Sequence, residues 1–289
     1  MPPPPAALDL HFAFTRVTRP AAPRTLLRHS DGDTPVVEQP IRMVSCDTPE
    51  KAGYAGGPLV AQKKLDLARE RLASGFYDTL PAPLRNYFIT RLDAGAALRH
   101  LDAGQRASEE FERLLARRLL RPDGTRRKLG IVPTGDLIDR YGRLLAYFAP
   151  YFNKPELPPK GDPERRTFNC DMVGLGWAAF FPLYPSLPGT ADMTLVLDAA
   201  VDAWTRRLGA WHEFGSKLLL AYEYRMCIKL ATANTAKAGI AAAFQRSCVD
   251  LRTRRDLGPF DWTRVPPPYR LWYWLDDAVR ARADLGVSS

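Results

Sequence analysis

The first half of the chain contains short segments in which hydrophobic and polar residues alternate. Alternation with a period of two is typical of β-strands that have one buried face. Segments of this kind predict strands at residues 8–17, 25–28, 41–46, 124–132 and 143–148. The pair Asp31-Gly32 is typical of a tight turn between two of them.

From Leu59 onward, hydrophobic residues follow the period of a helix instead. Leu59, Leu65, Leu67, Leu72 and Phe76 are interleaved with lysines, arginines and a glutamate, which suits an amphipathic helix. Further helices are predicted at residues 84–100, 108–120, 170–179, 192–208, 212–245 and 271–285. Short strands in the first half and mainly helices in the second predict an α+β protein.

Composition and charge narrow the class of protein. The chain has 289 residues, of which 46% are hydrophobic, as in soluble globular proteins. Apolar stretches are too short to span a bilayer, and the first residues lack the pattern of a secretory signal, so we expect a cytoplasmic protein without membrane contact. The four cysteines lack metal-ligand spacing and are expected to be reduced and buried. A net charge of +9 is a weak indication of a nucleic-acid partner.

Acidic residues and arginines concentrate in three short stretches, residues 31–34, 41–50 and 139–147. Carboxylate oxygens suit Ca²⁺ or Mg²⁺, and a further carboxylate can orient or deprotonate a water molecule. Arginine forks match phosphate oxygens and stabilise charge that develops on phosphorus. Each stretch taken alone is better explained as a turn with surface salt bridges. Together they contain the groups that metal-assisted phosphodiester hydrolysis requires.

In their order along the chain, the three stretches resemble the signature of the staphylococcal nuclease family. They read Asp-Gly-Asp-Thr, then Arg-x-x-x-x-Asp-Thr-Pro-Glu, then Asp-x-Tyr-Gly-Arg-x-Leu-Ala-Tyr. The resemblance implies an α+β fold with a five-stranded OB-type barrel. It also implies a Ca²⁺-dependent nuclease, a hydrolase that cleaves DNA, preferably single-stranded, and RNA, and that leaves 3′-phosphates.

The resemblance assigns roles to individual residues. The matching positions form three groups: metal ligands Asp33, Asp47 and Thr48; catalytic residues Arg42, Glu50 and Arg143; and substrate-binding residues Tyr141 and Tyr184. The aspartates would bind Ca²⁺ through their carboxylates and the threonine through its main-chain carbonyl. The arginines would grip the scissile phosphate, and the glutamate would act as general base.

The chain also departs from the family's pattern. Only residues 35–41 separate the first stretch from the first arginine of the second, and two of them are prolines, so the second and third barrel strands should be short. The segment between Glu50 and Asp139 is longer than usual. We therefore divide the chain into a nuclease core of residues 1–53 and 106–211, a helical insertion of residues 54–105 and a helical C-terminal extension of residues 212–289.

A function of a different class competes with the nuclease: a non-catalytic nucleic-acid-binding or scaffold protein on the same fold. The retained set of Asp, Glu and Arg residues favours the enzyme. Aromatic residues of the last third, such as Tyr222 and Trp272, are best explained as core, with base stacking as the alternative. The insertion either guides substrate or only covers the barrel. The insertion and the C-terminal helices are also candidates for contact with a protein partner or a second copy.

Overall fold

A computed structural model describes residues 23–51, 54–139 and 141–287. Strands and helices are mixed, as predicted for an α+β protein. The strands of the first part form two-stranded and three-stranded sheets. Their bounds are β1 Leu26–His29, β2 Pro35–Val37, β3 Ile41–Met43, β4 Ser45–Asp47, β5 Leu129–Ile138, β6 Leu144–Pro150 and β7 Ala179–Phe181.

The predicted five-stranded barrel is not seen: the described strands form small sheets, none of which closes. Strand β3 pairs in parallel with β6, which pairs antiparallel with β5, whereas β4 pairs with β7. The single strand predicted at residues 41–46 is divided because Ser45 has a left-handed backbone, with φ of 56°. The chain turns there and exchanges one partner strand for another. The strand predicted at residues 8–17 lies outside the described residues.

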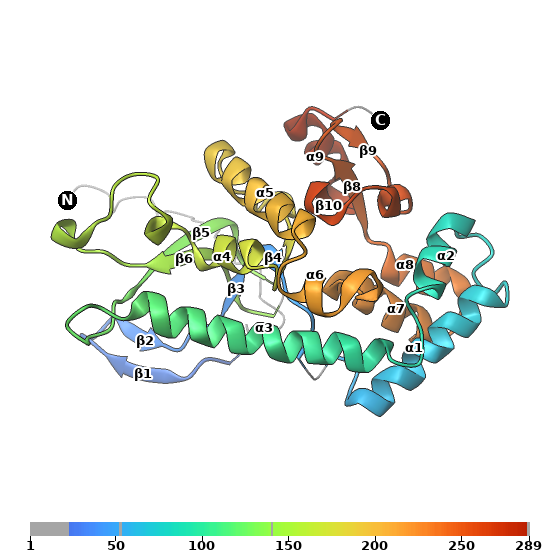
Figure 1. Cartoon of the computed structure of the whole chain (residues 1–289), viewed down its shortest axis with the longest axis horizontal. Helices are drawn as coiled ribbons and strands as arrows, with labels where there is room; N and C mark the ends of the chain where they lie inside the picture. Colours follow the sequence, from blue (N-terminus) through green and yellow to red (C-terminus); the bar gives the residue numbers. More distant parts are fainter. Residues whose placement is uncertain (1–22, 52–53, 140, 288–289) are drawn as a thin grey trace, which may run out of the picture.

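Three helices, α1 (Pro58–Ala73), α2 (Ala82–Ile89) and α3 (Ala96–Leu119), follow the loop after β4. The sequence predicted two separate helices, at residues 84–100 and 108–120, but α3 is continuous. It is continuous because no proline interrupts the segment and because the glycine at position 104 is tolerated within a packed helix. The expected boundary at residue 105 therefore lies inside α3. Helix α3 runs from the strands of the first part of the chain to α1 (Figure 1).

The rest of the chain is mainly helical and ends in a small sheet. Its elements are α4 Phe168–Gly174, α5 Thr190–Thr205, α6 Ala210–Glu213, α7 Ala221–Thr232, α8 Ala236–Ala243, β8 Arg246–Asp250, β9 Arg255–Asp256, β10 Arg270–Trp274 and α9 Ala278–Leu285. The prediction of one helix over residues 271–285 is wrong for its first part. There Leu-Trp-Tyr-Trp pairs with β8, as expected for aromatic residues on a half-buried sheet.

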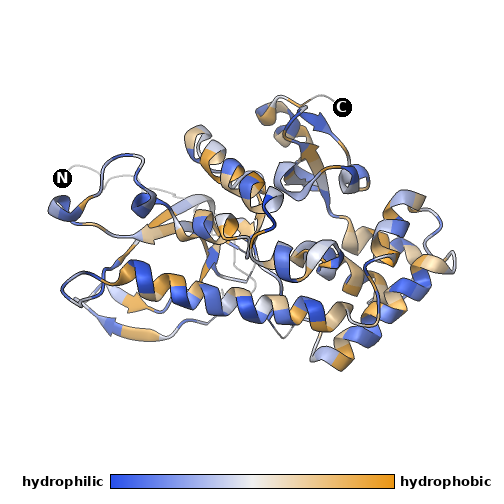
Figure 2. Cartoon of the chain, in the orientation of Figure 1, coloured by the Kyte–Doolittle hydropathy of each residue, from blue (hydrophilic) through white to orange (hydrophobic). Residues whose placement is uncertain are grey.

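The insertion and the C-terminal extension share one hydrophobic core. Leu65, Tyr77 and Phe88 of the insertion are fully buried together with Tyr224 and Trp262 of the extension. Hydrophobic and hydrophilic residues alternate along α1 and α3, as in helices with one buried side (Figure 2). The aromatic residues of the last third therefore belong mainly to the core, as predicted.

Two further expectations concern composition. All four cysteines are free and buried, which confirms the prediction of reduced thiols. Within the described part of the chain, no helix is both long and apolar enough to cross a bilayer.

Candidate active site

Three of the predicted site residues lie close together on β3, β4 and the loop that follows β4. Arg42 lies on β3, Asp47 ends β4, and Glu50 follows three residues later. The Nη2 atom of Arg42 donates to Oδ1 of Asp47 at 2.6 Å, and the Asp47 side chain is only 1% exposed. A buried carboxylate needs a cationic partner, and this pair supplies one.

A second arginine, which the sequence analysis did not identify, reaches the same carboxylates. Arg225 of α7 donates from Nη2 to Oδ2 of Asp47 at 2.6 Å and from Nη1 to Oε1 of Glu50 at 2.6 Å. Both oxygens of Asp47 thus accept from a guanidinium group. The C-terminal extension contributes directly to the site.

These contacts shift the pKa values of the charged groups. Burial raises the pKa of Asp47, but the guanidinium groups of Arg225 and Arg42 outweigh burial and hold it below its usual value. Burial lowers the pKa of Arg225, but the carboxylates of Asp47 and Glu50 reverse this and raise it. Asp47 is therefore ionised and Arg225 charged at neutral pH.

Helix α3 holds the backbone of the same loop. The N–H of Glu50 donates to Nε2 of His100 at 2.9 Å, while Nδ1 of His100 lies 3.0 Å from the carbonyl of Leu219. Because Nε2 accepts, the proton of the neutral ring lies on Nδ1 and is donated to that carbonyl. The ring stacks on Tyr224 at 4.0 Å, and burial lowers the pKa of His100 to about 3. His100 links the loop after β4 to the segment that precedes α7.

Gly104, one turn further along α3, allows this close approach. A Cβ atom at this position would lie 2.4 Å from the backbone carbon of Glu50. Any side chain here would push α3 and the loop apart, because backbone atoms cannot move aside as a flexible side chain can.

Arg143 lies in the turn immediately before β6. In the parallel pairing of β3 with β6, Ile41 is opposite Leu144 and Arg42 is opposite Leu145, so Arg143 enters β6 beside the start of β3. Arg143 is bound through Nε and Nη2 to Oδ2 of Asp139, at 2.8 and 2.7 Å, and its side chain is 38% exposed. The two arginines predicted to grip the phosphate thus come from neighbouring segments, and each is paired with a different aspartate.

The predicted metal ligands are not brought together. Asp33 lies in the exposed turn between β1 and β2, where it accepts from the hydroxyl of Thr34 at 3.1 Å, and Thr48 is half-buried beyond β4. Among the described residues, no three His, Cys, Asp or Glu side chains form a group that could hold a metal ion. Asp33, Asp47 and Glu50 therefore do not form such a group.

The two tyrosines predicted to contact nucleotide lie in different surroundings. Tyr141 is exposed, with the guanidinium of Arg143 at 5.3 Å from its ring centroid. Tyr184 is 6% exposed, packs against Leu271 and Tyr273, and donates its hydroxyl proton to Asp284. In this position the Tyr184 ring is part of the C-terminal core and has no open face for a base.

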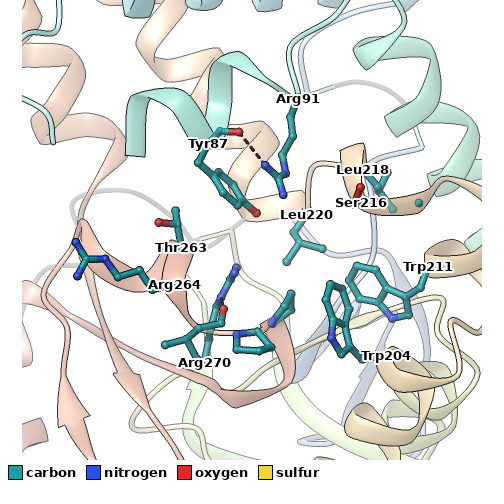
Figure 3. Close-up of a pocket in the computed structure, with 14 residues that line it drawn as sticks. Tyr87, Arg91, Trp204, Trp211, Ser216, Leu218, Leu220, Thr263, Arg264 and Arg270 are labelled. Carbon is teal, nitrogen blue, oxygen red and sulfur yellow. Dashed lines mark hydrogen bonds between the residues drawn. The ribbon is translucent and has the colours of Figure 1, made fainter. Parts of the chain in front are cut away.

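A cavity of about 230 Å³ lies beside the site, between α2, α6 and the segment before β10. Figure 3 shows Tyr87 and Arg91 on one side and Trp204 and Trp211 on the other. The guanidinium of Arg91 lies 3.6 Å from the Tyr87 ring centroid. The Nε atom of Arg91 is buried and has no hydrogen-bond partner among the described residues. Trp211 also lines a narrow second cavity that reaches Asp47.

Comparison with known proteins adds no assignment. No protein-family model matches the sequence, and no curated protein is significantly similar to it. The resemblance to the nuclease family therefore depends on the three short stretches of sequence alone.

Proposed function

We propose that the protein binds the phosphate backbone of nucleic acids at the ends of β3, β4 and β6 and hydrolyses phosphodiester bonds there. One observation carries this proposal. Arg42, Asp47 and Glu50 are linked by ion pairs through Asp47 and Arg225, and Arg143 lies immediately before β6, the strand that pairs with β3. Arginine forks beside a carboxylate are suited to a phosphate and to the water that attacks it.

In this proposal each residue has a defined task. Arg42 and Arg143 bind the non-bridging oxygens of the scissile phosphate and stabilise the charge of the transition state. Glu50 accepts a proton from the attacking water, whose oxygen forms the new bond to phosphorus. The bond from phosphorus to the 5′ oxygen breaks, and that oxygen takes up a proton from solvent, which leaves a 3′-phosphate.

Ca²⁺, which the family resemblance implies, does not fit the described arrangement. Both carboxylate oxygens of Asp47 are bound by arginines, and Asp33 lies in an exposed turn. Calcium is bound by six to eight oxygen ligands, mainly from carboxylates, carbonyls and water. We therefore derive no step of hydrolysis that passes through a metal ion.

The cavity of Tyr87, Arg91, Trp204 and Trp211 is proposed to hold a base of the bound strand. Aromatic faces stack on bases of any sequence, and arginine adds a cation close to the ring or to a phosphate. The cavity adjoins the carboxylate site through Trp211. Trp204→Ala should weaken binding of single-stranded DNA roughly fivefold or more, equivalent to about 1 kcal/mol per lost stacking contact.

A second candidate function is binding of nucleic acid without cleavage. The two ion pairs that Arg225 makes with Asp47 and Glu50 favour it, because they engage the groups that would otherwise act on water or metal. The same arginines would still attract phosphates.

Digestion of single-stranded DNA, duplex DNA and RNA, with and without Ca²⁺, separates the two functions. Glu50→Gln should abolish cleavage and retain binding measured by fluorescence anisotropy. Glu112→Gln, an exposed residue of α3, serves as the matched control. Binding without cleavage under all conditions would support the second function, and absence of both would refute the proposal.

A further inference from the structure

Arg225 occupies the space between the two carboxylates of the site. Its guanidinium donates to Asp47 and to Glu50 at 2.6 Å each, from two different nitrogens. We propose that Arg225 is the resident cation of this site: it holds the two carboxylates together in place of a divalent metal ion, and their capacity to bind metal is latent while Arg225 is present. Arg225 would have this role whether or not the protein cleaves nucleic acid.

The charge of the site supports this assignment. Arg42 and Arg225 balance Asp47 and Glu50, and together the four ionised groups have no net charge. A divalent cation brought to this site would be repelled by two guanidinium groups. Without Arg225, two carboxylates would face a single arginine, which leaves a net charge of −1 and free oxygens on both acids. Hard divalent cations such as Mg²⁺ are commonly held by one or two carboxylates together with water, so such a pair would suit one.

Helix α7 holds Arg225 in place. Its neighbours Tyr224 and Met226 are buried, and Tyr224 stacks on His100. Further along α7, the carbonyl of Leu230 accepts from the hydroxyl of Tyr77 at 2.7 Å and from Arg71 at 3.0 Å. Withdrawal of Arg225 by movement of α7 would disrupt this packing. The backbone of Arg225 is therefore fixed, and its guanidinium is held between the carboxylates by the two ion pairs of 2.6 Å.

Metal binding by purified variants tests the assignment without any need for activity. Ca²⁺ is titrated by calorimetry, and free Mn²⁺ is counted by electron paramagnetic resonance. The proteins compared are wild type, Arg225→Met, and Arg225→Met combined with Asp47→Asn. Arg252→Met is the matched control, because Arg252 also pairs with a buried carboxylate of the extension, Asp250, at 2.8 Å.

We expect no site that depends on Asp47 in the wild type. Arg225→Met should bind one ion with a dissociation constant of about 10⁻⁴ to 10⁻³ M, the range of weak calcium sites. The double variant should lose this site, and Arg252→Met should behave like the wild type. A folded Arg225→Met protein that binds no more metal than the wild type would overturn the proposal.

Wild type and Asp47→Asn provide a test that does not require Arg225→Met to fold. Absence of metal binding in both supports the proposal. One equivalent of Ca²⁺ bound by the wild type and lost in Asp47→Asn would overturn it, because the carboxylate would then bind metal in the presence of Arg225. Neither result depends on nucleolytic activity, so failure of this proposal is distinguishable from failure of the nuclease proposal.

Discussion

The hairpin of β1 and β2 and the end of β4 each contain an aspartate from the nuclease-like stretches, yet the surroundings of the two aspartates differ. Asp33 is exposed and accepts a hydrogen bond from the hydroxyl of the next residue, Thr34. Asp47 is buried between two guanidinium groups that come from β3 and α7. Similar local sequence therefore gives either a solvated turn acid or the centre of a charge network, and the packing around it decides which.

Replacement of the two aspartates should give the largest contrast. Asp47→Ala leaves Arg42 and Arg225 without their shared carboxylate and should lower the free energy of unfolding by about 3 kcal/mol. Asp33→Ala should change it by less than about 0.5 kcal/mol, as for ordinary surface positions. Urea denaturation followed by circular dichroism measures both. Equal effects of the two substitutions would show that Asp47 is not the centre of a buried network.

The close packing of α3 on the loop after β4 can be broken by one methyl group. Gly104→Ala places a Cβ atom 2.4 Å from the backbone of Glu50 and should destabilise the protein by about 1–3 kcal/mol. Gly32→Ala in the β1–β2 turn meets no atom within 4 Å and is the control. If both glycines tolerate alanine equally in thermal denaturation, α3 does not clamp the loop.

The buried histidine makes the loop sensitive to pH. Burial lowers the pKa of His100 to about 3 in the folded protein; the Leu219 carbonyl and Asp47 oppose this shift, and the nearby charge of Arg225 adds to it. The unfolded value is about 6.5. Between these values the unfolded chain binds more protons, so stability decreases as the pH falls below about 6.5.

The slope due to this one group is at most about 1.4 kcal/mol per pH unit. The free energy of unfolding measured between pH 7.5 and 5 should therefore decrease more steeply in the wild type than in His100→Asn. Asp47, whose pKa lies below its usual value, titrates under more acidic conditions and does not contribute in this range. Parallel pH profiles would contradict a neutral, buried His100.

The smallest change in the free energy of unfolding is expected for substitution of the half-exposed Arg143. Arg143→Lys loses the fork that binds Asp139 but remains half-exposed, so the free energy of unfolding should change by less than about 0.5 kcal/mol. If the nuclease proposal is correct, cleavage should nevertheless fall at least about tenfold, since lysine cannot bind phosphate bidentately. Unchanged cleavage would make Arg143 an ordinary surface residue.

The sequence by itself determined those features that depend on residues close together along the chain. Residues 41–50 place Arg42, Asp47 and Glu50 within one strand-and-loop segment, so their proximity was predictable from the stretch alone. The α+β class followed from the periodicity of hydrophobic residues. The separate helices predicted at 84–100 and 108–120, and the last helix, were less accurate because tertiary packing overrides local preference.

Only the tertiary structure decided what surrounds the carboxylates. Arg225 lies 178 residues from Asp47 in sequence, and His100 lies 50 residues from Glu50. A helical pattern places Arg225 on α7 but does not show which loop that face meets. Contacts over such separations form when the insertion and the extension bury their apolar faces together. The hydrophobic effect that drives this burial is non-directional, so the partners of each charge depend on the packing of the whole chain.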